Sequence, residues 1–298
     1  MARRCCGSRK GCRRSCARRR RRHPDPDGTP TVRIGFVGAG RMGRPMVARL
    51  VAAGHDVRVL GRSDEKRSTI AELGAAAVRE IAAVSANADV VVVCVFTNEQ
   101  VREVCLADGL VAAMPAGSAL VLHTTGSPRT VEAVADRAAS HGVEVVDAPV
   151  SGGPHNAAAG ELTLFVGGSD DTVARVRPVV SCYGDPVLHV GPLGAGQKVK
   201  LVNNALFAAQ IGMLSSAVEL ATRLGVEESS LLTALRNGSA ASRVLDIVAA
   251  GGSVASFIET AGEFVGKDIA VIRSVAAELG SDLGALDDVI DAAIPGVR

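Results

Sequence analysis

The fold of this chain is decided near its start by the stretch Val32-Arg33-Ile34-Gly35-Phe36-Val37-Gly38-Ala39-Gly40-Arg41-Met42-Gly43. Its first half is apolar and ends at a glycine, which predicts a buried strand over Val32–Val37. Its second half sets three glycines in the order G-x-G-x-x-G, and a helix-forming segment follows from Arg44 to Ala53. A strand, a glycine turn and a helix in this order predict the first unit of an open, doubly wound sheet.

The three glycines of this turn have separate physical roles. Gly38 permits the tight turn, Gly40 lets the backbone approach a pyrophosphate, and Gly43 allows the helix to pack closely on the strand. The positive end of the helix then faces the phosphates. The alternative is a plain glycine turn. We expect a dinucleotide cofactor to bind along the whole turn, at Gly38, Ala39, Gly40, Arg41, Met42 and Gly43.

The end of the second expected strand, Asp56–Leu60, bears on which nicotinamide cofactor is used. An acidic residue about 20 positions after the turn would bind the ribose 2′-hydroxyl of NAD, but Gly-Arg-Ser follows Leu60. Arg62 can pair with a 2′-phosphate, Ser63 can donate to it, and Lys66 adds positive charge. This pattern favours NADP(H) while NAD(H) stays possible. The alternative is that Arg62 is an ordinary solvated side chain.

Beyond this unit, apolar strands alternate with helices as far as Gly191. Such alternation predicts an α/β fold with a doubly wound parallel sheet covered on both faces. The further strands are expected at Asp89–Phe96, Ala119–His123, Val143–Val146, Leu162–Val166 and Pro186–Val190. The helices between strands are expected at Ser68–Leu73, Arg79–Ala86, Asn98–Ala107, Pro128–His141 and Thr172–Cys182.

After Gly191 the strand signals end, and only helices are expected. Their predicted ranges are Val199–Leu224, Glu227–Asn237, Ser242–Ala249, Phe264–Leu279 and Leu286–Ala293. The chain is therefore expected to have three parts. They are an Arg-rich tail of residues 1–30, a cofactor-binding domain of residues 31–191, and an all-helical domain of residues 192–298 for substrate binding and dimerisation.

The first helix of the last part combines a long apolar run with polar residues near its start. Lys200 and Asn204 are four positions apart and share one face of the helix. The run is apolar nearly all round, so we expect it to be buried on several sides. A buried lysine needs a partner or a chemical task. Two interpretations stay open: Lys200 is a general acid/base, or its charge reaches solvent beside a capping amide.

Two further segments end strands at the carboxyl edge of the sheet, where ligands bind in open α/β folds. Residues 147–153 read Asp-Ala-Pro-Val-Ser-Gly-Gly, and residues 124–128 read Thr-Thr-Gly-Ser-Pro. Ser151 offers a hydroxyl, and Gly152 and Gly153 offer backbone N–H groups, which together suit the carboxylate of a substrate. The alternative is that these residues form an ordinary turn.

Positive charge is concentrated in the tail. The 298 residues carry a formal net charge of +2, but residues 1–28 hold ten Arg and one Lys against two Asp. The rest has 22 basic and 29 acidic residues, a net charge of −7, which offers no nucleic-acid surface.

The three cysteines outside the tail are scattered, which argues against a disulfide framework. With no uninterrupted apolar run of transmembrane length, we expect a soluble protein of the reducing cytoplasm.

Residues 1–30 have almost no apolar content and cannot build a core. A disordered appendage or an over-extended start site is the favoured interpretation. An organelle-targeting peptide would show an apolar helical face, which is missing here. The cysteine spacings match no zinc pattern, and we expect no metal site in the chain.

Four motifs in this order resemble the β-hydroxyacid dehydrogenases, which include 3-hydroxyisobutyrate dehydrogenase, tartronate semialdehyde reductase and the glyoxylate/succinic semialdehyde reductases. The motifs are the glycine turn with Met42, the run Asp147–Gly153, the stretch Gly194–Asn204, and Gly266-Lys267-Asp268-Ile269. The resemblance covers Val32 to about Ala293. It implies a Rossmann domain followed by an all-helical domain, with the cofactor in the cleft between them.

The resemblance also implies roles for individual residues. Lys200 would be the catalytic lysine with Asn204 as its neighbour, and Ser151–Gly153 would bind the substrate acid. The implied activity interconverts a small β-hydroxyacid and its semialdehyde with a nicotinamide cofactor, in a homodimer or homotetramer. Cofactor use in the family is mixed, so the preference for NADP(H) rests on Arg62 and Ser63. The cofactor side of the cleft would be lined by Phe96, Thr97, Thr125 and Lys267.

Some positions depart from the family pattern, and the sequence also bears on other enzyme families. Asn156 stands where the family usually has glycine, and Glu161 where it often has threonine, so contacts to the distal part of the substrate would differ. A short-chain dehydrogenase needs Tyr-x-x-x-Lys, but Val187 stands four positions after the single Tyr183. A 6-phosphogluconate dehydrogenase would be a longer chain. The open alternatives are an imine reductase-like enzyme, which typically lacks the helix lysine, and a non-enzymatic binder acting through the Arg-rich tail.

Overall fold

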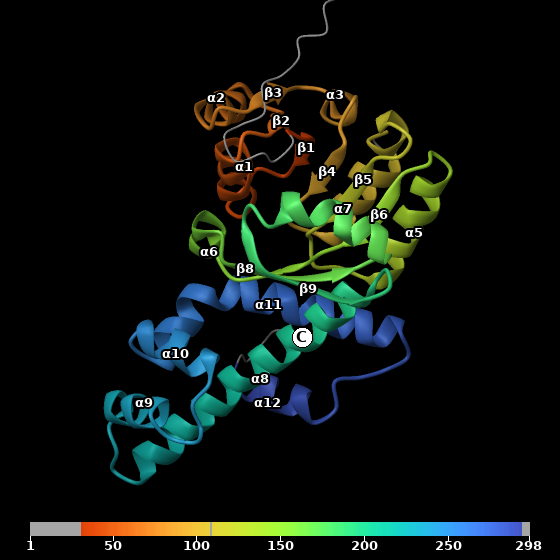
Figure 1. The fold of residues 1–298 in the computed structure, drawn as a ribbon. Helices are drawn as coiled ribbons and strands as arrows, with labels where there is room; N and C mark the ends of the chain where they lie inside the picture. The colour runs from red at the N-terminus through yellow and green to blue at the C-terminus, as the bar shows by residue number, and fades with distance from the viewer. Residues whose placement is uncertain (1–30, 108, 294–298) are drawn as a thin grey trace, which may run out of the picture. The chain divides into compact units, whose positions relative to one another are not determined.

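The computed structural model describes residues 31–293 apart from residue 108, so the tail expected at residues 1–30 lies outside the described residues. From Val32 onward the chain forms one compact unit. Strands and helices alternate up to Gly191, and only helices follow, from Ala195 to Ala293 (Figure 1). The mixed α/β architecture expected from the sequence is confirmed.

The strands form one sheet in the order β3-β2-β1-β4-β5-β6-β8-β7, with β9 paired to β8. The pairs from β3 to β6 are parallel, which gives the 3-2-1-4-5-6 strand order of a Rossmann fold. The bounds are β1 Arg33–Val37, β2 Asp56–Leu60, β3 Ala76–Val78, β4 Val90–Val93, β5 Ala119–Leu122, β6 Glu144–Asp147, β7 Val150–Ser151, β8 Leu162–Gly167 and β9 Gly184–Gly191.

The far edge of the sheet differs from the expected all-parallel arrangement. β8 is antiparallel to β6 and to β7, and β9 is parallel to β8. The residues between β6 and β8 form the short strand β7 and the six-residue helix α6 (Pro154–Ala159). Parallel neighbours need a longer crossover that returns the chain across the sheet face, so the chain here turns back in the opposite direction.

Alternate residues of each strand face opposite sides of the sheet and build two cores. Ile34 and Phe36 of β1 pack in one core with α1 and α7, and Val91 and Val93 of β4 pack in the other core with α5. The helices of this part are α1 Gly43–Ala52, α2 Asp64–Glu72, α3 Ile81–Ser85, α4 Asn98–Arg102, α5 Pro128–Ala139 and α7 Asp170–Val180.

Several element bounds differ from the sequence-based expectation. Helix α2 begins at Asp64 rather than Ser68, because the Ser63 hydroxyl caps it by accepting from the Lys66 amide. Its first turns are polar, so the sequence there lacks the spacing of apolar residues by which a helix is predicted. The three-residue strand β3 was not predicted, and the expected helix Asn98–Ala107 ends as an α-helix at Arg102 and continues as a π-helical turn.

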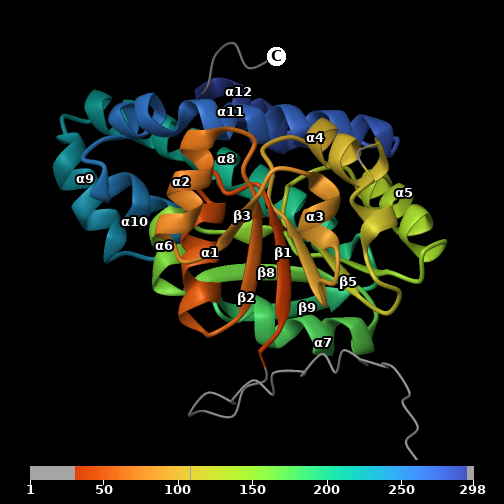
Figure 2. The same ribbon diagram turned by 90° about the horizontal axis from the view of Figure 1, so that it is seen from above.

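The helical part consists of α8 Ala195–Arg223, α9 Glu228–Arg236, α10 Arg243–Ala250, α11 Val254–Glu278 and α12 Ala285–Ala293. Helix α11 starts at Val254, capped by Ser253, ten residues before the predicted start. Helix α8 packs on β8, α11 and α12. Figure 2 shows α11 lying across the edge of the sheet at which the parallel strands end.

Helix α8 is the one helix among the described residues whose length and composition would allow a membrane span. One third of its most apolar 18-residue segment is buried within the protein, and core helices of soluble proteins can have the same length and composition. Its buried residues include the polar side chains Gln197, Lys200 and Asn204, each with a place in the site described next.

Candidate active site

The glycine turn between β1 and α1 has the shape expected of a phosphate cradle. Gly38 has φ +102°, and a side chain there would lie 2.1 Å from the Cys94 carbonyl oxygen. A side chain at Gly43 would lie 2.2 Å from the Gly38 carbonyl oxygen, whereas the space within 4 Å of the Cβ position of Gly40 is open. No side chain caps α1, and its first turn holds no acid. The turn therefore fits the diphosphate of a dinucleotide.

The residues expected to select the cofactor follow β2 at the same edge of the sheet. Arg62, Ser63 and Lys66 are all exposed. The Ser63 hydroxyl accepts from the Lys66 backbone amide at 3.2 Å, which leaves its own proton available for donation. Two basic residues and a hydroxyl donor therefore lie within the last residues before α2 and its first turn.

The start of α8 is anchored to the sheet by Asp147, the last residue of β6. Its buried carboxylate accepts from the Gly194 and Gln197 amides, both at 2.7 Å. Burial raises the pKa of Asp147, and these hydrogen bonds oppose that shift. Any side chain at Gly196 would lie 2.3 Å from the Phe165 carbonyl oxygen, so glycine allows the helix to press against the sheet.

Gln197 ties the same helix turn to the loop after β5. Its Oε1 accepts from the Gly126 amide at 2.9 Å, and its Nε2 donates to the Thr124 carbonyl oxygen at 2.8 Å. Half-buried Thr125 lies between these two contacts. Sequence reasoning assigned no role to Asp147 or Gln197, because each acts through partners that are distant along the chain.

Lys200 lies one turn further along α8, with only 8% of its surface exposed. Burial lowers the pKa of its ammonium group; the Asp268 carboxylate opposes this shift and Lys267 adds to it. Asn204, four residues on, is also buried and donates from Nδ2 to Asp268 Oδ2 at 2.9 Å. The predicted pair therefore lies together with an acid of α11 to which sequence reasoning gave no function.

Lys267 and Asp268 lie in the middle of α11, where Lys267 contacts the loop after β4 and Asp268 contacts α8. Lys267 Nζ donates to the Phe96 carbonyl oxygen at 3.1 Å and lies 3.6 Å from Asp268 Oδ1. Burial raises the pKa of Asp268, and Lys267 and Lys200 oppose that shift. Thr97 is fixed as the cap of α4 by a capping box with Gln100. The predicted residues Phe96, Thr97 and Lys267 are thus brought together at the carboxyl edge of the sheet.

The loop expected to bind the substrate acid connects β7 to α6. Ser151 is half-buried, and Gly152 has φ +124°, which favours glycine. The Gly153 amide already donates to Asn156 Oδ1 at 2.9 Å. Among the described residues, this loop forms no hydrogen bond with Lys200 or Asn204. Asn156, which departs from the family pattern, therefore occupies the Gly153 amide, one of the donors expected to bind the substrate.

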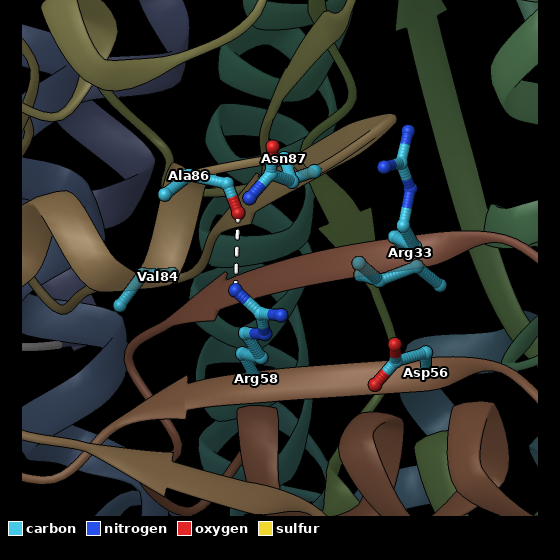
Figure 3. A pocket seen from close by; sticks show the side chains of 8 residues that line it. Arg33, Asp56, Arg58, Val84, Ala86 and Asn87 are labelled. Carbon is cyan, nitrogen blue, oxygen red and sulfur yellow. Dashed lines mark hydrogen bonds between the residues drawn. The ribbon is translucent and has the colours of Figure 1, made fainter. Parts of the chain in front are cut away.

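A separate hollow lies at the opposite edge of the sheet, where β1 and β2 begin (Figure 3). Arg58 Nη1 donates to the Ala86 carbonyl oxygen at 3.1 Å, and Arg33 forms an ion pair with Asp89. Both arginines are therefore engaged by the protein. Ligands of open α/β sheets bind at the carboxyl edge, so this hollow is not part of the candidate site.

Two family descriptions match the chain. Residues 33–191 match the NAD-binding domain of 6-phosphogluconate dehydrogenase, and residues 194–290 match the NAD-binding domain of NADP-dependent 3-hydroxyisobutyrate dehydrogenase. Together they span nearly all the described residues. They cover the glycine turn, the Lys200 helix and the Lys267–Asp268 pair.

Named relatives agree with these matches. A probable 3-hydroxyisobutyrate dehydrogenase of Mycobacterium bovis is 41% identical over 66% of this chain and 67% of its own length. The 3-hydroxyisobutyrate dehydrogenase of Pseudomonas aeruginosa is 34% identical, and the 2-(hydroxymethyl)glutarate dehydrogenase of Eubacterium barkeri is 32% identical, each over 72% of both chains.

A solved structure shares the whole architecture. The 3-hydroxyisobutyrate dehydrogenase of Mycobacterium tuberculosis, studied with L-serine, superposes with a TM-score of 0.80 and 31% identity over 88% of this chain and 92% of its own. An imine reductase of Myxococcus stipitatus, at 18% identity and a TM-score of 0.53, shares the fold alone. The chain therefore belongs to the β-hydroxyacid dehydrogenase family, and it is a nicotinamide-dependent dehydrogenase acting on CH–OH groups.

Proposed function

We propose that this enzyme interconverts a small β-hydroxyacid and its semialdehyde with NADP(H), and that Lys200 is the general acid/base. The observation that carries the proposal is the burial of Lys200 beside Asn204 and Asp268, at the edge of the sheet where the glycine turn lies. A lysine whose charge reaches solvent would need none of these neighbours. Its burial beside them supports the general acid/base interpretation over the solvated one.

The bound nicotinamide supplies hydride transfer, and the protein's residues handle the proton. In oxidation, Lys200 accepts the proton from the substrate hydroxyl, which requires its neutral form. Burial favours that form by lowering the pKa of the ammonium group. Asn204 orients the lysine and the substrate oxygen, and its bond to Asp268 holds its amide in one position.

Cofactor binding is assigned to the strand-bearing part, in which residues 31–191 act as a cofactor-binding domain. The turn residues Gly38–Gly43 cradle the diphosphate, and Arg62, Ser63 and Lys66 meet the 2′-phosphate. This set favours NADP(H) over NAD(H). The nicotinamide half would lie against Phe96, Thr97, Thr125 and Lys267.

Substrate binding is assigned to Ser151, Gly152 and Gly153, which would hold a carboxylate. The relatives named for 3-hydroxyisobutyrate and 2-(hydroxymethyl)glutarate act on acids of this class. In this chain the Gly153 amide would have to exchange Asn156 for the substrate.

The helical part, residues 192–298, is assigned to substrate binding and dimerisation of a cytoplasmic enzyme. Four large apolar side chains of α8 and the residue that caps its C-terminus are exposed and recur at intervals of four and seven, which places them on one stripe of the helix. They are Val202, Leu206, Met213, Leu220 and Leu224. A second copy covering this stripe would remove it from water. Light scattering should give the mass of a dimer or tetramer, and a monomer at micromolar concentration would contradict the assignment.

The direct test is a screen of short β-hydroxyacids and their semialdehydes, followed by NADPH absorbance. We expect turnover with at least one small acid, and higher efficiency with NADP(H) than with NAD(H). Turnover confined to cyclic imines would instead support the imine reductase alternative. A chain lacking residues 1–30 should keep its turnover, whereas loss of all function on that deletion would favour a binder acting through the tail.

A further inference from the structure

A row of alternating cations and aromatic rings joins the glycine turn to α11. The Arg41 guanidinium carbon lies 4.7 Å from the centroid of the Phe264 ring. That ring meets Phe96 edge-on, with centroids 6.3 Å apart and planes at 88°. Lys267 Nζ then lies 4.5 Å from the centroid of Phe96. The row begins in the turn after β1, passes the loop after β4, and has its other members in α11.

Arg41 stands out in this row because its charge has no counter-ion among the described residues. Its side chain forms neither a hydrogen bond nor an ion pair there, and it contacts the face of the Phe264 ring. A ring face attracts a cation without neutralising it. The guanidinium therefore keeps its full charge and its donors, directly beside a helix start that no side chain caps.

The two rings are exposed to an unusual degree for phenylalanine. Phe96 has 47% of its surface exposed and Phe264 has 38%. Leaving both rings partly in water forgoes the free energy of burial. Their edge-on contact and the two cations hold them in one place. The ring of Phe264 is therefore a fixed support for Arg41 that belongs to the helical part of the chain.

We infer that Phe264 is a positioning residue for the cofactor: it holds the Arg41 guanidinium over the glycine turn, where it meets the phosphates. This inference rests on the proposed binding of the dinucleotide at that turn. It also goes further, because it makes cofactor affinity depend on the docking of α11. By reciprocity, the bound cofactor strengthens the docking of α11 against the turn.

A double-mutant cycle on NADPH binding tests this inference. The dissociation constant is measured from nicotinamide fluorescence for the wild type, Arg41→Gln, Phe264→Leu and the double variant. Phe264→Leu keeps an apolar side chain but removes the ring face, and we expect the dissociation constant to rise about two- to fivefold. The double variant should bind no more weakly than Arg41→Gln alone, because the ring acts only through the arginine.

Two further variants control for packing and folding. Phe264→Tyr keeps the ring face, so this variant should bind NADPH with the affinity of the wild type. Phe257→Leu removes another ring of α11, one that packs on Phe207 and not on an arginine, and should leave affinity unchanged. Thermal melts without NADPH verify that each variant folds. If Phe264→Leu fails to fold, the inference is tested instead by comparing the NADPH affinity of Arg41→Lys with that of the wild type. Lysine keeps the charge but loses the planar stacking, so its affinity should fall between those of wild type and Arg41→Gln.

The outcomes separate this inference from the proposed function. Additive effects of Arg41→Gln and Phe264→Leu, unchanged binding by Phe264→Leu, or wild-type binding by Arg41→Lys would overturn the positioning role while NADPH still binds. A wild-type protein that binds no NADPH would overturn both. An effect of Phe257→Leu as large as that of Phe264→Leu would assign the loss to general packing of α11.

Discussion

The two parts of the chain offer their ligands different kinds of groups. The strand-bearing part presents mainly backbone, in the turn Gly38–Gly43 and in the loop Ser151–Gly153. The helical part presents side chains, with Lys200 buried beside Asn204 and Asp268. Backbone amides can bind an anionic group by hydrogen bonds, but they cannot give up a proton near neutral pH. We therefore propose that the first part binds the phosphates and the substrate carboxylate, and that the second part supplies the proton-transferring side chain.

The largest expected effect follows from replacing the one side chain assigned to proton transfer. Lys200→Ala should lower turnover by about 10²–10⁴-fold, because it removes the side chain proposed to accept the hydroxyl proton. NADPH affinity should change little, since the phosphates are proposed to bind to the other part. Steady-state rates and NADPH fluorescence titration measure the two quantities.

The neighbours of this lysine provide matched controls. Lys198→Ala, two residues earlier on another face of α8, should have a mild effect. Asn204→Ala should fall between the two, because the amide orients groups without transferring a proton. If Lys200→Ala keeps its turnover or unfolds, the lysine is structural and the division between the two parts fails.

The next largest effect concerns the strand-bearing part. Arg62→Asp should narrow or reverse the preference for NADP(H), because a charge-assisted contact contributes about 1.5–3 kcal/mol, or roughly tenfold to a hundredfold in affinity. Turnover at saturating cofactor should change little. Efficiencies with NADPH and NADH compared side by side check this, and equal efficiency of the wild type with both would contradict the assignment.

A pH profile sharpens the role of the helical part. Oxidation needs neutral Lys200, so its rate should rise with pH through the lysine pKa, which burial places below the usual 10.5. The Asp268 carboxylate raises that pKa, so Asp268→Asn should shift the rising limb to lower pH. The asparagine oxygen can still accept from Asn204. A shift to higher pH, or none, would show that Asp268 does not act on the lysine through charge.

The smallest effect tests the backbone donors of the substrate loop. Asn156→Ala frees the Gly153 amide, so the KM for a β-hydroxyacid should fall about threefold with little change in kcat. The methyl ester of the same acid serves as the control, since it lacks the charge that such a donor prefers. Equal changes for acid and ester would point to a general disturbance of α6 and not to a carboxylate contact.

Much of the fold was predictable because the signals are local. The glycine turn follows directly from residues 38–43, and the alternation of strand and helix follows from apolar runs of strand length. The predicted strand Asp56–Leu60 has the observed bounds. Where the prediction was wrong, the signal was weak. The first turns of α2 are polar, and the antiparallel turn into β8 is set by pairing with strands that are distant in sequence.

The site divides in the same way. By itself the sequence placed Lys200 and Asn204 on one helix face, and it located the phosphate turn, because helix periodicity and glycine conformation are properties of neighbouring residues. Only the tertiary structure brought Asp268 to Asn204, 64 positions away, and set Asp147 and Gln197 to anchor the start of α8. It also placed the Phe264 ring under Arg41. The physical reason is that a lowered lysine pKa and an oriented amide arise from burial and from contacts between distant segments, which no local pattern encodes.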